Sequence, residues 1–573
     1  MIIRQRELPA LQSWAGDDDT PQLLRRIYLA RGIDGPEQLG RQLAELPSPV
    51  QLRGVDSALD ILEEALRHQQ RVLFVGDFDA DGATSTALGV LALGAMGFTH
   101  VDFLVPNRFE YGYGLTPEIV DLALTKNPNL LITVDNGISS MEGVAAARAA
   151  GLRVIVTDHH LPGSQLPEAD AIVNPNQPGC TFPTRNLAGV GVIFFLLTAL
   201  RARLRHSGWF AEQGIAEPNM ANFLDLVALG TVADVVPLDR VNRVLVHQGL
   251  QRIRAGVCRP GILALIELAG RDNARLVASD LGFAVGPRLN AAGRLDDMTH
   301  GILLLLENDP AQARSLAEAL DQLNNDRRVI EVAMQQEALE LVQGLHLDRQ
   351  ALPWGLCLYD PGWHQGVVGL LASRIKERFY RPVIAFGRDG NGDLKGSARS
   401  IVGFHIRDAL DAVAARYPGL VRKFGGHAMA AGLSLAGEHF QRFAEAFDEE
   451  VRRQLTEETL EEVVLIDGIL ETDDICLETA RLLREAGPWG QHFPEPLFRG
   501  EFTVLEQRVV GGKHLKFNLG SDHDHDFAVE AIAFNVPPHQ LATSLTGVDV
   551  TYRLDVNVWR GRESVQLIID RIL

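Results

Sequence analysis

Three short acidic segments contain residue types that bind metal ions. The first reads DFDADG and places Asp77, Asp79 and Asp81 at alternate positions before a glycine. An EF-hand calcium loop begins in the same way, but it needs a bidentate Glu at its twelfth position, which is Leu88 here. The apolar run 71–75 before the segment also predicts a strand, whereas an EF-hand loop follows a helix. A calcium loop is therefore excluded.

The two other acidic segments also follow runs that predict strands. Asp135 ends the segment LLITVD, and Asp158, His159 and His160 end the segment RVIVTDHH. The carboxyl ends of parallel strands meet at one edge of a sheet, where ligands bind in open α/β proteins. Three such strand ends therefore predict one shared site. Asp234, at the end of the apolar segment LGTVAD, is a fourth candidate.

Carboxylates that lie close together repel one another unless a cation neutralises them. A donor set of carboxylate oxygens with one imidazole suits Mg²⁺ and Mn²⁺, and the imidazole favours Mn²⁺. The acidic groups outnumber the needs of one ion, which favours a pair of ions about 4 Å apart, as in enzymes that hydrolyse phosphate esters. A single Asp at a strand end is more often only a helix cap, so this prediction depends on the three segments together.

The elements expected around these residues alternate between strands and helices. Strands are predicted at 71–75, 100–106, 129–135 and 153–158, and helices at 83–97, 117–125 and 140–150. This alternation is typical of βαβ units and a parallel sheet. A proline-free segment after Pro310 predicts a helix of about 35 residues, roughly 50 Å long. Beyond about residue 460, short strands and turns predict a small antiparallel barrel or sandwich.

Composition indicates a globular protein of several domains, with 573 residues, 46% of them hydrophobic and 22% charged. The four cysteines lack CxxC spacing, which disfavours a disulfide framework or a structural zinc site and favours a reducing cytoplasm. The longest apolar run, 189–200, is too short to span a bilayer, and the N-terminus lacks the apolar core of a signal peptide. A cytoplasmic protein without membrane contact is expected.

The net charge of −20 argues against nucleic-acid binding over the whole surface. Charge is uneven, however, because residues 374–423 contain 11 Lys and Arg against 5 Asp and Glu, a local balance of +6. Such a segment can hold a polyanion, because local potential outweighs total charge. Within it, KGSARS contains Lys395, Ser397, Arg399 and Ser400, which suit a phosphate through charge-assisted hydrogen bonds.

The motifs, in this order and spacing, resemble those of the DHH phosphoesterase superfamily. DFDADG, VDNG, TDHH and GTVADVVPL match its four motifs, and GPRLNAAGR, WHQGVVGLLASR, KGSARS and FGGHAMAAG match its DHHA1 companion domain. The DHH triplet alone is weak evidence, whereas eight ordered motifs between residues 77 and 432 are specific. With its barrel-like tail, the whole chain is similar to the RecJ family of single-strand-specific exonucleases.

The resemblance implies roles for individual residues. The metal ligands would be Asp77, Asp79, Asp81, Asp135, His159 and Asp234, with Asp77 as an additional or outer ligand. Asp158 would orient the site, and His160 would face the scissile phosphate. The residues that hold the 5′ phosphate and the backbone would be Arg108, Arg288, Lys395, Ser397, Arg399, Ser400, Gly425, Gly426 and His427. Many members have a His where this chain has Val75, so the second metal is expected to be held more weakly or partly by Asp77.

The implied fold is α/β, with a DHH parallel-sheet lobe and a DHHA1 lobe joined by a long helix, and a C-terminal OB-like β-barrel. The expected domains are a lead-in (1–50), the DHH catalytic domain (51–300), the connecting helix (301–346), the DHHA1 substrate-binding domain (347–455) and an OB-like single-stranded-DNA-binding domain (456–573). The implied activity is 5′→3′ hydrolysis of single-stranded DNA to 5′-mononucleotides in DNA repair and recombination. Two divalent cations would support it, Mn²⁺ preferred or Mg²⁺.

Two other functions stay open. A phosphodiesterase for short oligonucleotides or cyclic dinucleotides belongs to the same superfamily, but such enzymes tend to lack a terminal barrel. A catalytically inactive single-stranded-DNA-binding scaffold is disfavoured, because the acidic motifs are intact. The resemblance also implies a monomer that works with single-strand-binding protein and a RecQ-type helicase.

Overall fold

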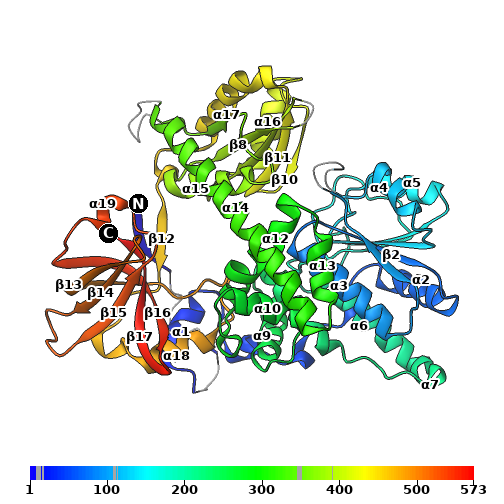
Figure 1. The fold of residues 1–573 in the computed structure, drawn as a ribbon, viewed down its shortest axis with the longest axis horizontal. Helices are drawn as coiled ribbons and strands as arrows, with labels where there is room; N and C mark the ends of the chain where they lie inside the picture. The colour runs from blue at the N-terminus through cyan, green and yellow to red at the C-terminus, as the bar shows by residue number, and fades with distance from the viewer. Residues whose placement is uncertain (8–13, 16–18, 108–110, 112–113, 345–351, 390–391) are drawn as a thin grey trace. The chain divides into compact units, whose positions relative to one another are not determined.

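The computed structural model describes residues 1–7, 14–15, 19–107, 111, 114–344, 352–389 and 392–573. The chain divides into two compact units, whose elements are labelled in Figure 1. The smaller unit contains residues 1–4, 294–296 and 322–464, and the larger contains 5–293, 297–321 and 465–573. The barrel thus shares a unit with the first sheet, and the boundaries of the five expected domains stay a prediction.

The larger unit contains a five-stranded parallel sheet, as the alternating pattern predicts. Its strands, in spatial order, are β3 (Val101–Leu104), β2 (Val72–Gly76), β4 (Leu130–Val134), β5 (Arg153–Thr157) and β6 (Ala171–Val173). The sequence prediction missed β6. The chain passes from β2 to β3 on one side and then to β4 on the other, so the strand order reverses between β2 and β4. Ligands bind at such topological switch points.

Helices cover both faces of this sheet (Figure 1). One face carries α2 (Val55–Arg67), α3 (Ala80–Ala95) and α6 (Gly189–His206), and the other carries α4 (Pro117–Leu124) and α5 (Met141–Ala149). The strands are buried on both faces and read as continuous apolar runs, as parallel strands do. Val75, for example, is fully buried in a cluster with Ile119 and Val144.

A helical region follows the sheet. Its main helices are α8 (Leu224–Ala233), α9 (Arg240–Arg254), α10 (Pro260–Leu268), α12 (Gly286–Leu295) and α13 (Thr299–Leu306). The predicted long helix is confirmed as α14 (Pro310–Gly344), which has 35 residues. Asp309 caps it, because its carboxylate accepts hydrogen bonds from the backbone N–H groups of Ala311 and Gln312, both 2.9 Å. The part of α14 up to Asp321 belongs to the larger unit and the remainder to the smaller.

The smaller unit has a five-stranded mixed sheet. In spatial order its strands are β10 (Lys423–Gly426), β11 (Ala430–Leu435), β9 (Leu394–Arg399), β8 (Val383–Arg388) and β7 (Leu356–Tyr359). Only β7 and β8 pair in parallel. Three helices accompany the sheet: α15 (Val368–Phe379), α16 (Ile406–Arg416) and α17 (Phe440–Gln454). Phe386, Phe443 and Phe447 lie at the centre of its core.

The C-terminal strands form a closed barrel. Their order around it is β13 (Phe498–Val510), β14 (His514–Gly520), β15 (Ala528–Ala533), β17 (Arg562–Ile572) and β16 (Gly547–Trp559). The prediction of a wholly antiparallel arrangement is wrong for one pair, because β15 and β17 are parallel. Closure removes the free strand edges that a sandwich would leave. Across the part of the chain described here, no helix combines the length and the apolar character that a membrane span requires.

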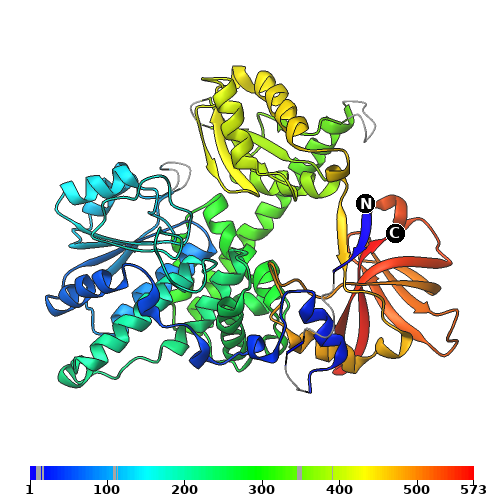
Figure 2. The same ribbon diagram turned by 180° about the vertical axis from the view of Figure 1, so that it is seen from behind.

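The beginning of the chain packs against the segment that precedes the barrel. Strand β1 (Ile2–Gln5) pairs with β12 (Val463–Ile466), and Figure 2 shows the two side by side. The hydroxyl of Tyr28, in α1 (Gln22–Leu29), donates to the carbonyl of Ala486 at 2.9 Å. Arg31 forms a buried ion pair of 2.6 Å with Asp467. Tyr28 and Arg31 therefore fasten the lead-in to residues 467–486 within the larger unit.

Candidate metal centre

The segment DFDADG forms the connection from β2 to α3. Asp77 follows β2 and is buried. Asp79 caps α3, because its carboxylate accepts hydrogen bonds from the backbone N–H groups of Asp81 (3.0 Å) and Gly82 (3.1 Å). Asp81 therefore lies in the first turn of the helix, although the sequence predicts a helix that starts at residue 83. A Cβ at Gly82 would lie 2.4 Å from the carbonyl oxygen of Asp77, so the turn requires glycine here.

Asp135 follows β4 in a strained backbone conformation. Its φ of 61° lies in the left-handed region, which costs a non-glycine residue on the order of 1 kcal/mol and is often found at functional sites. Asn136 fixes the turn, because its side-chain amide donates to the carbonyls of Val75 (3.0 Å) and Val134 (2.9 Å). This buried asparagine bridges β2 and β4 at the switch point. It was not among the site residues predicted from the sequence.

Asp158 follows β5 and organises the two histidines. Its carboxylate accepts backbone hydrogen bonds from Ile138 (2.9 Å), His159 (2.7 Å) and His160 (3.1 Å), and it contacts Nδ1 of His160 at 2.8 Å. Burial by itself raises the pKa of Asp158, but the hydrogen bond and charge of His160 outweigh burial and lower that pKa. Burial likewise lowers the pKa of His160, but Asp158 outweighs it and raises the pKa to about 9.

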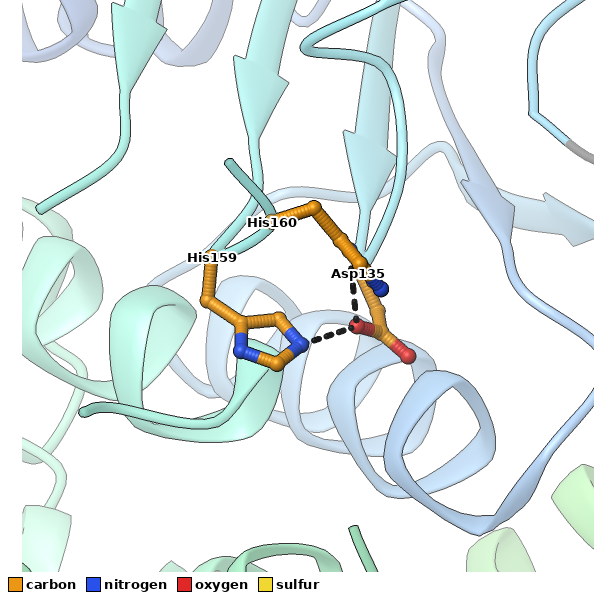
Figure 3. A group of neighbouring side chains, drawn as sticks. All are labelled: Asp135, His159 and His160. Carbon is orange, nitrogen blue, oxygen red and sulfur yellow. Dashed lines mark ion pairs between the residues drawn. The ribbon is translucent and has the colours of Figure 1, made fainter. Parts of the chain in front are cut away.

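The predicted residues converge on His159. Its Nε2 lies 3.1 Å from Oδ1 of Asp135, 3.4 Å from Oδ2 of Asp234 and 3.9 Å from Oδ2 of Asp81. Figure 3 shows the contact with Asp135, which also lies 4.0 Å from Nδ1 of His160. Asp234 reaches the site from the C-terminal end of α8. Ends of three strands and a helix thus meet, as the sequence predicts.

Candidate ligand atoms within 4.8 Å of one another form three overlapping groups. The groups are Asp77, Asp79 and Asp135; Asp81, His159 and Asp234; and Asp135, His159 and His160. Together they contain all six residues expected to bind metal. The first two groups share no residue, although Asp135 and His159 are 3.1 Å apart. Two adjacent binding positions would use them both.

The electrostatics of the cluster fit a divalent cation. Burial, and then the nearby Asp234, raises the pKa of Asp81 to about 7. Burial and Asp79 raise the pKa of Asp234 to about 8, and burial with Asp81 raises that of Asp135 well above its usual range. Nε2 of His159 is buried and accepts no hydrogen bond from any residue that the structure describes. A cation would neutralise the carboxylates and use this nitrogen as a ligand.

Backbone groups of α6 hold Asp81 in place. The N–H groups of Gly189 and Val190 donate to the two oxygens of the carboxylate, at 2.6 Å and 2.9 Å. They belong to the first turn of α6, whose positive end favours a negative side chain. A Cβ at Gly189 would lie 2.7 Å from Cβ of Asp135, so the helix start must pass close to the site. In the sequence this segment is recognisable only as an apolar run.

The motif GPRLNAAGR supports the DFDADG segment through residues that the sequence analysis did not single out. The side-chain oxygen of Asn290 accepts a hydrogen bond from the backbone N–H of Ala80 at 2.8 Å. Gly293 allows α12 to approach the carbonyl oxygen of Phe78, which would lie 1.8 Å from a Cβ at this position. The motif GPRLNAAGR could have indicated this contact in the sequence. Its Gly293 contacts the DFDADG segment, whereas its Arg288 was the residue predicted to act.

Arg288 is enclosed by protein groups. Its side chain is buried, its Nε donates to Asp321 at 2.7 Å, and its Nη1 donates to the carbonyl of Ala284 at 2.6 Å. This ion pair connects α12 to α14, and a phosphate contact by Arg288 stays a prediction. Arg108 lies outside the described residues. Val75 points into the core, so this position provides no ligand, whereas Asp77 lies with Asp79 and Asp135.

The smaller unit presents the predicted phosphate-binding residues on one sheet. Lys395, Ser397 and Arg399 alternate with buried residues on β9 and therefore share a face. Ser397 lies opposite Gly432 on β11, which lies opposite Gly425 on β10, so this row carries almost no side chains. Among the residues that the structure describes, none except the chain neighbours of Gly425 comes within 4 Å of a Cβ placed there. A polymer backbone can approach such a row closely.

The remaining predicted residues of this unit differ in their surroundings. Gly426 follows Gly425 on β10, and His427 is exposed in the turn that leads to β11. Ser400 is buried, and its hydroxyl donates to the carbonyl of Phe404 at 2.6 Å. It therefore supports a turn beside the face. A Cβ at Gly369, near the start of α15, would lie 2.9 Å from the side chains of both Ser397 and Arg399.

Family models match three segments of the chain. The DHH family N-terminal domain matches residues 71–231, the DHHA1 domain matches 354–453, and the RecJ OB domain matches 466–571. The first match contains all the residues of the candidate metal centre except Asp234, which lies three residues beyond it.

Full-length relatives are similar along the whole chain. Single-stranded-DNA-specific exonuclease RecJ of Dickeya dadantii is 57% identical over 97% of this chain and 96% of its own length. RecJ of Escherichia coli is 56% identical over 100% of this chain and 98% of its own length.

A crystal structure of RecJ from Thermus thermophilus in complex with Mn²⁺ superposes with a TM-score of 0.81, at 31% sequence identity, and covers 100% of this chain and 79% of that chain. A structure of the same protein with Mg²⁺ has a TM-score of 0.74 at 30% identity. Both structures thus contain a divalent cation of the kind that the acidic cluster fits. Three domains match family models, the acidic strand ends occur in the expected order, and more than half of the residues are identical to those of full-length relatives. The chain therefore belongs to the RecJ family of exonucleases.

Proposed function

We propose that this protein hydrolyses single-stranded DNA from a free 5′ end and releases 5′-mononucleotides, in DNA repair and recombination. The observation that carries the proposal is the buried group of carboxylates and one imidazole at the switch point between β2 and β4. The barrel and the full-length similarity favour this activity over a short-oligonucleotide phosphodiesterase. Intact ligand groups favour it over an inactive scaffold.

Each part of the site has a distinct task in this proposal. We assign Asp77, Asp79 and Asp135 to one cation and Asp81, His159 and Asp234 to a second, with Mn²⁺ preferred. When bound, divalent cations supply charge neutralisation at the phosphate and activation of the attacking water. Asp158 holds Nδ1 of His160 at 2.8 Å and so orients the ring, and we assign the ring to the scissile phosphate. The hydrogen bonds from Gly189 and Val190 keep Asp81 in its position.

The direction of hydrolysis is tested with labelled single strands. Long single-stranded DNA labelled at its 5′ or its 3′ end is incubated with the protein and Mn²⁺, with a chelator as control. The 5′ label is expected in mononucleotides at the earliest time points, and the chelator is expected to stop its release. Earlier release of the 3′ label would refute the direction. Cleavage of dinucleotides without degradation of long strands would support the phosphodiesterase instead.

Arg399→Ala is expected to weaken binding of single-stranded DNA and to reduce its dependence on salt. Arg399 shares a face with Lys395 and Ser397, where its guanidinium suits a phosphate. Loss of one phosphate contact lowers the slope of log affinity against log salt by about 0.7 for a single strand. Fluorescence anisotropy at several salt concentrations measures this slope. Arg442→Ala, an exposed arginine of α17 outside residues 374–423, serves as control, and equal slopes in the two variants would contradict the assignment.

Trp559→Ala is expected to weaken binding to long single strands about tenfold, because one stacked base contributes roughly 1–3 kcal/mol. Trp559 ends β16, is 70% exposed and lies 5.7 Å from the guanidinium of Arg560. An exposed aromatic ring beside a cation suits stacking on a base. Val257→Ala, which removes another exposed apolar side chain of this unit, provides the control. If both variants bind long strands equally well, the barrel does not use this ring.

We also propose the wider setting that the family resemblance implies. The protein would act as a monomer in the cytoplasm, on strands supplied by a RecQ-type helicase and covered by single-strand-binding protein. Mass measurement in solution and pull-down with each purified partner test these assignments separately.

A further inference from the structure

A cavity of about 390 Å³ lies in the larger unit, away from the residues assigned to the metal centre. Its walls come from the lead-in, from the beginning of α9 and from the loop before the barrel. Charged side chains from these walls include Asp239, Arg240 and Arg243, with His492 beside them.

Arg243 contributes a buried positive charge to the cavity. The side chain is 8% exposed, and its guanidinium stacks on Phe493 at 4.4 Å. It donates to the carbonyls of Leu238 and Gln38, both at 3.0 Å. Among the residues that the structure describes, no carboxylate forms an ion pair with it. Burial lowers the pKa of Arg243 and outweighs the attraction of Asp239 for the guanidinium, so an anionic ligand would stabilise the charged form.

The charged residues that line the cavity have a positive formal balance. Arg240 is the first residue of α9 and is 51% exposed on its side chain, with Glu45 at 3.4 Å. The carboxylate of Asp239 also faces the cavity, but it accepts hydrogen bonds from Thr184, from Asn186 (3.0 Å) and from the backbone N–H of Asn242 (3.1 Å). The carboxylate keeps its charge, and the described residues that line the cavity include three arginines, Arg31 among them, against one aspartate.

Two short segments connect the cavity to the metal centre. Asn186 lies three residues before Gly189, whose N–H donates a hydrogen bond to Asp81. Asp239 follows the candidate ligand Asp234 by five residues. The cavity is therefore adjacent to the metal centre in the chain, yet it shares no residue with the candidate ligand groups.

We propose that this cavity binds a phosphate monoester of mononucleotide size. Two guanidinium groups suit a dianionic phosphate through charge-assisted hydrogen bonds. The volume lies near the lower end of the roughly 300–1,000 Å³ typical of small-ligand sites, which fits one nucleotide. The proposal rests on the proposed function in one respect, since 5′-mononucleotides are the products assigned to the metal centre.

Binding is tested with thymidine 5′-monophosphate and the full-length protein in the presence of EDTA. Isothermal titration gives the affinity, and Trp489, which stacks on Phe493 at 5.0 Å, gives an independent fluorescence signal. Arg240→Glu is expected to lower the affinity about tenfold or more, because it replaces a charge-assisted contact by repulsion. His492→Gly, at a φ of 59° that glycine adopts without strain, is expected to lower it less. Competition by inorganic phosphate distinguishes recognition of phosphate alone from recognition of the nucleotide.

Arg205→Glu provides a matched control for Arg240→Glu. Arg205 is 58% exposed on its side chain and lies 3.6 Å from Glu217, but it belongs to the end of α6 and does not line the cavity. Its variant is expected to bind the nucleotide normally, as is Arg399→Ala. Equal affinities of Arg240→Glu and Arg205→Glu, or no saturable binding, would refute the cavity site. Failure of the unaltered protein to degrade DNA while it still binds the nucleotide would refute the proposed function and leave this site supported.

Discussion

Replacement of Asp81 by alanine is expected to lower hydrolysis of single-stranded DNA by about a thousandfold or more, beyond the roughly 10–100-fold typical when a partner of a metal ligand is lost. Asp81 is fully buried and lies within reach of both His159 and Asp234. Its removal takes away one candidate ligand and leaves the N–H groups of Gly189 and Val190 without their acceptor. Release of mononucleotides measures activity, and the electron paramagnetic resonance of Mn²⁺ measures bound ions.

Binding of single-stranded DNA by this variant is expected to persist, because the basic face of β9 is unchanged. Asp121→Ala, an exposed aspartate of α4, serves as control for the loss of one negative charge. Thermal melting in the presence of a chelator shows whether both variants fold. Near-normal activity of a folded Asp81→Ala protein would show that the assigned metal centre is wrong.

Gly293→Ala is expected to damage both stability and catalysis. The added Cβ would lie 1.8 Å from the carbonyl oxygen of Phe78, so α12 or the segment that carries Asp77 and Asp79 must move. Overpacking of this kind costs about 1–3 kcal/mol, and a shift of about 1 Å at a reacting centre lowers a rate on the order of a hundredfold. Differential scanning fluorimetry and the rate of mononucleotide release measure the two effects.

Gly94→Ala provides the matched substitution. Gly94 is also helical, in α3, but within the described part of the chain a Cβ there would meet nothing within 4 Å beyond its own helix. Alanine is favoured over glycine inside a helix by roughly 0.5–1 kcal/mol, so this variant is expected to be slightly more stable and fully active. If Gly293→Ala behaved like Gly94→Ala, α12 would not determine the position of the DFDADG segment.

The parts of the fold that local patterns encode could be predicted from the sequence. Buried parallel strands give continuous apolar runs, so β2, β4 and β5 were located to within one or two residues, and Asp135 and Asp158 at their ends with them. The long helix α14 was predicted because neither proline nor glycine interrupts its interior. Asp234 was located because it ends an apolar helix within a recognisable motif.

The contacts that position these residues could not be predicted in the same way. The hydrogen bonds from Gly189 to Asp81 and from Ala80 to Asn290 join segments more than 100 residues apart. The hydrophobic periodicity of the sequence does not predict such pairings, because they depend on how helices approach one another in the folded chain. The parallel pairing of β15 with β17 has the same origin, since an alternating strand pattern is compatible with either direction.

The packing of Tyr28 on the segment around Ala486 has a consequence for synthesis on the ribosome. The two residues are 458 positions apart, so at about 5–20 residues per second the second emerges roughly 25–90 s after the first. During that interval α1 has no access to the surface that buries Tyr28 in the finished protein. The contact of Tyr28 therefore forms only after residue 486 has been made, and completion of the larger unit must wait for nearly the whole chain.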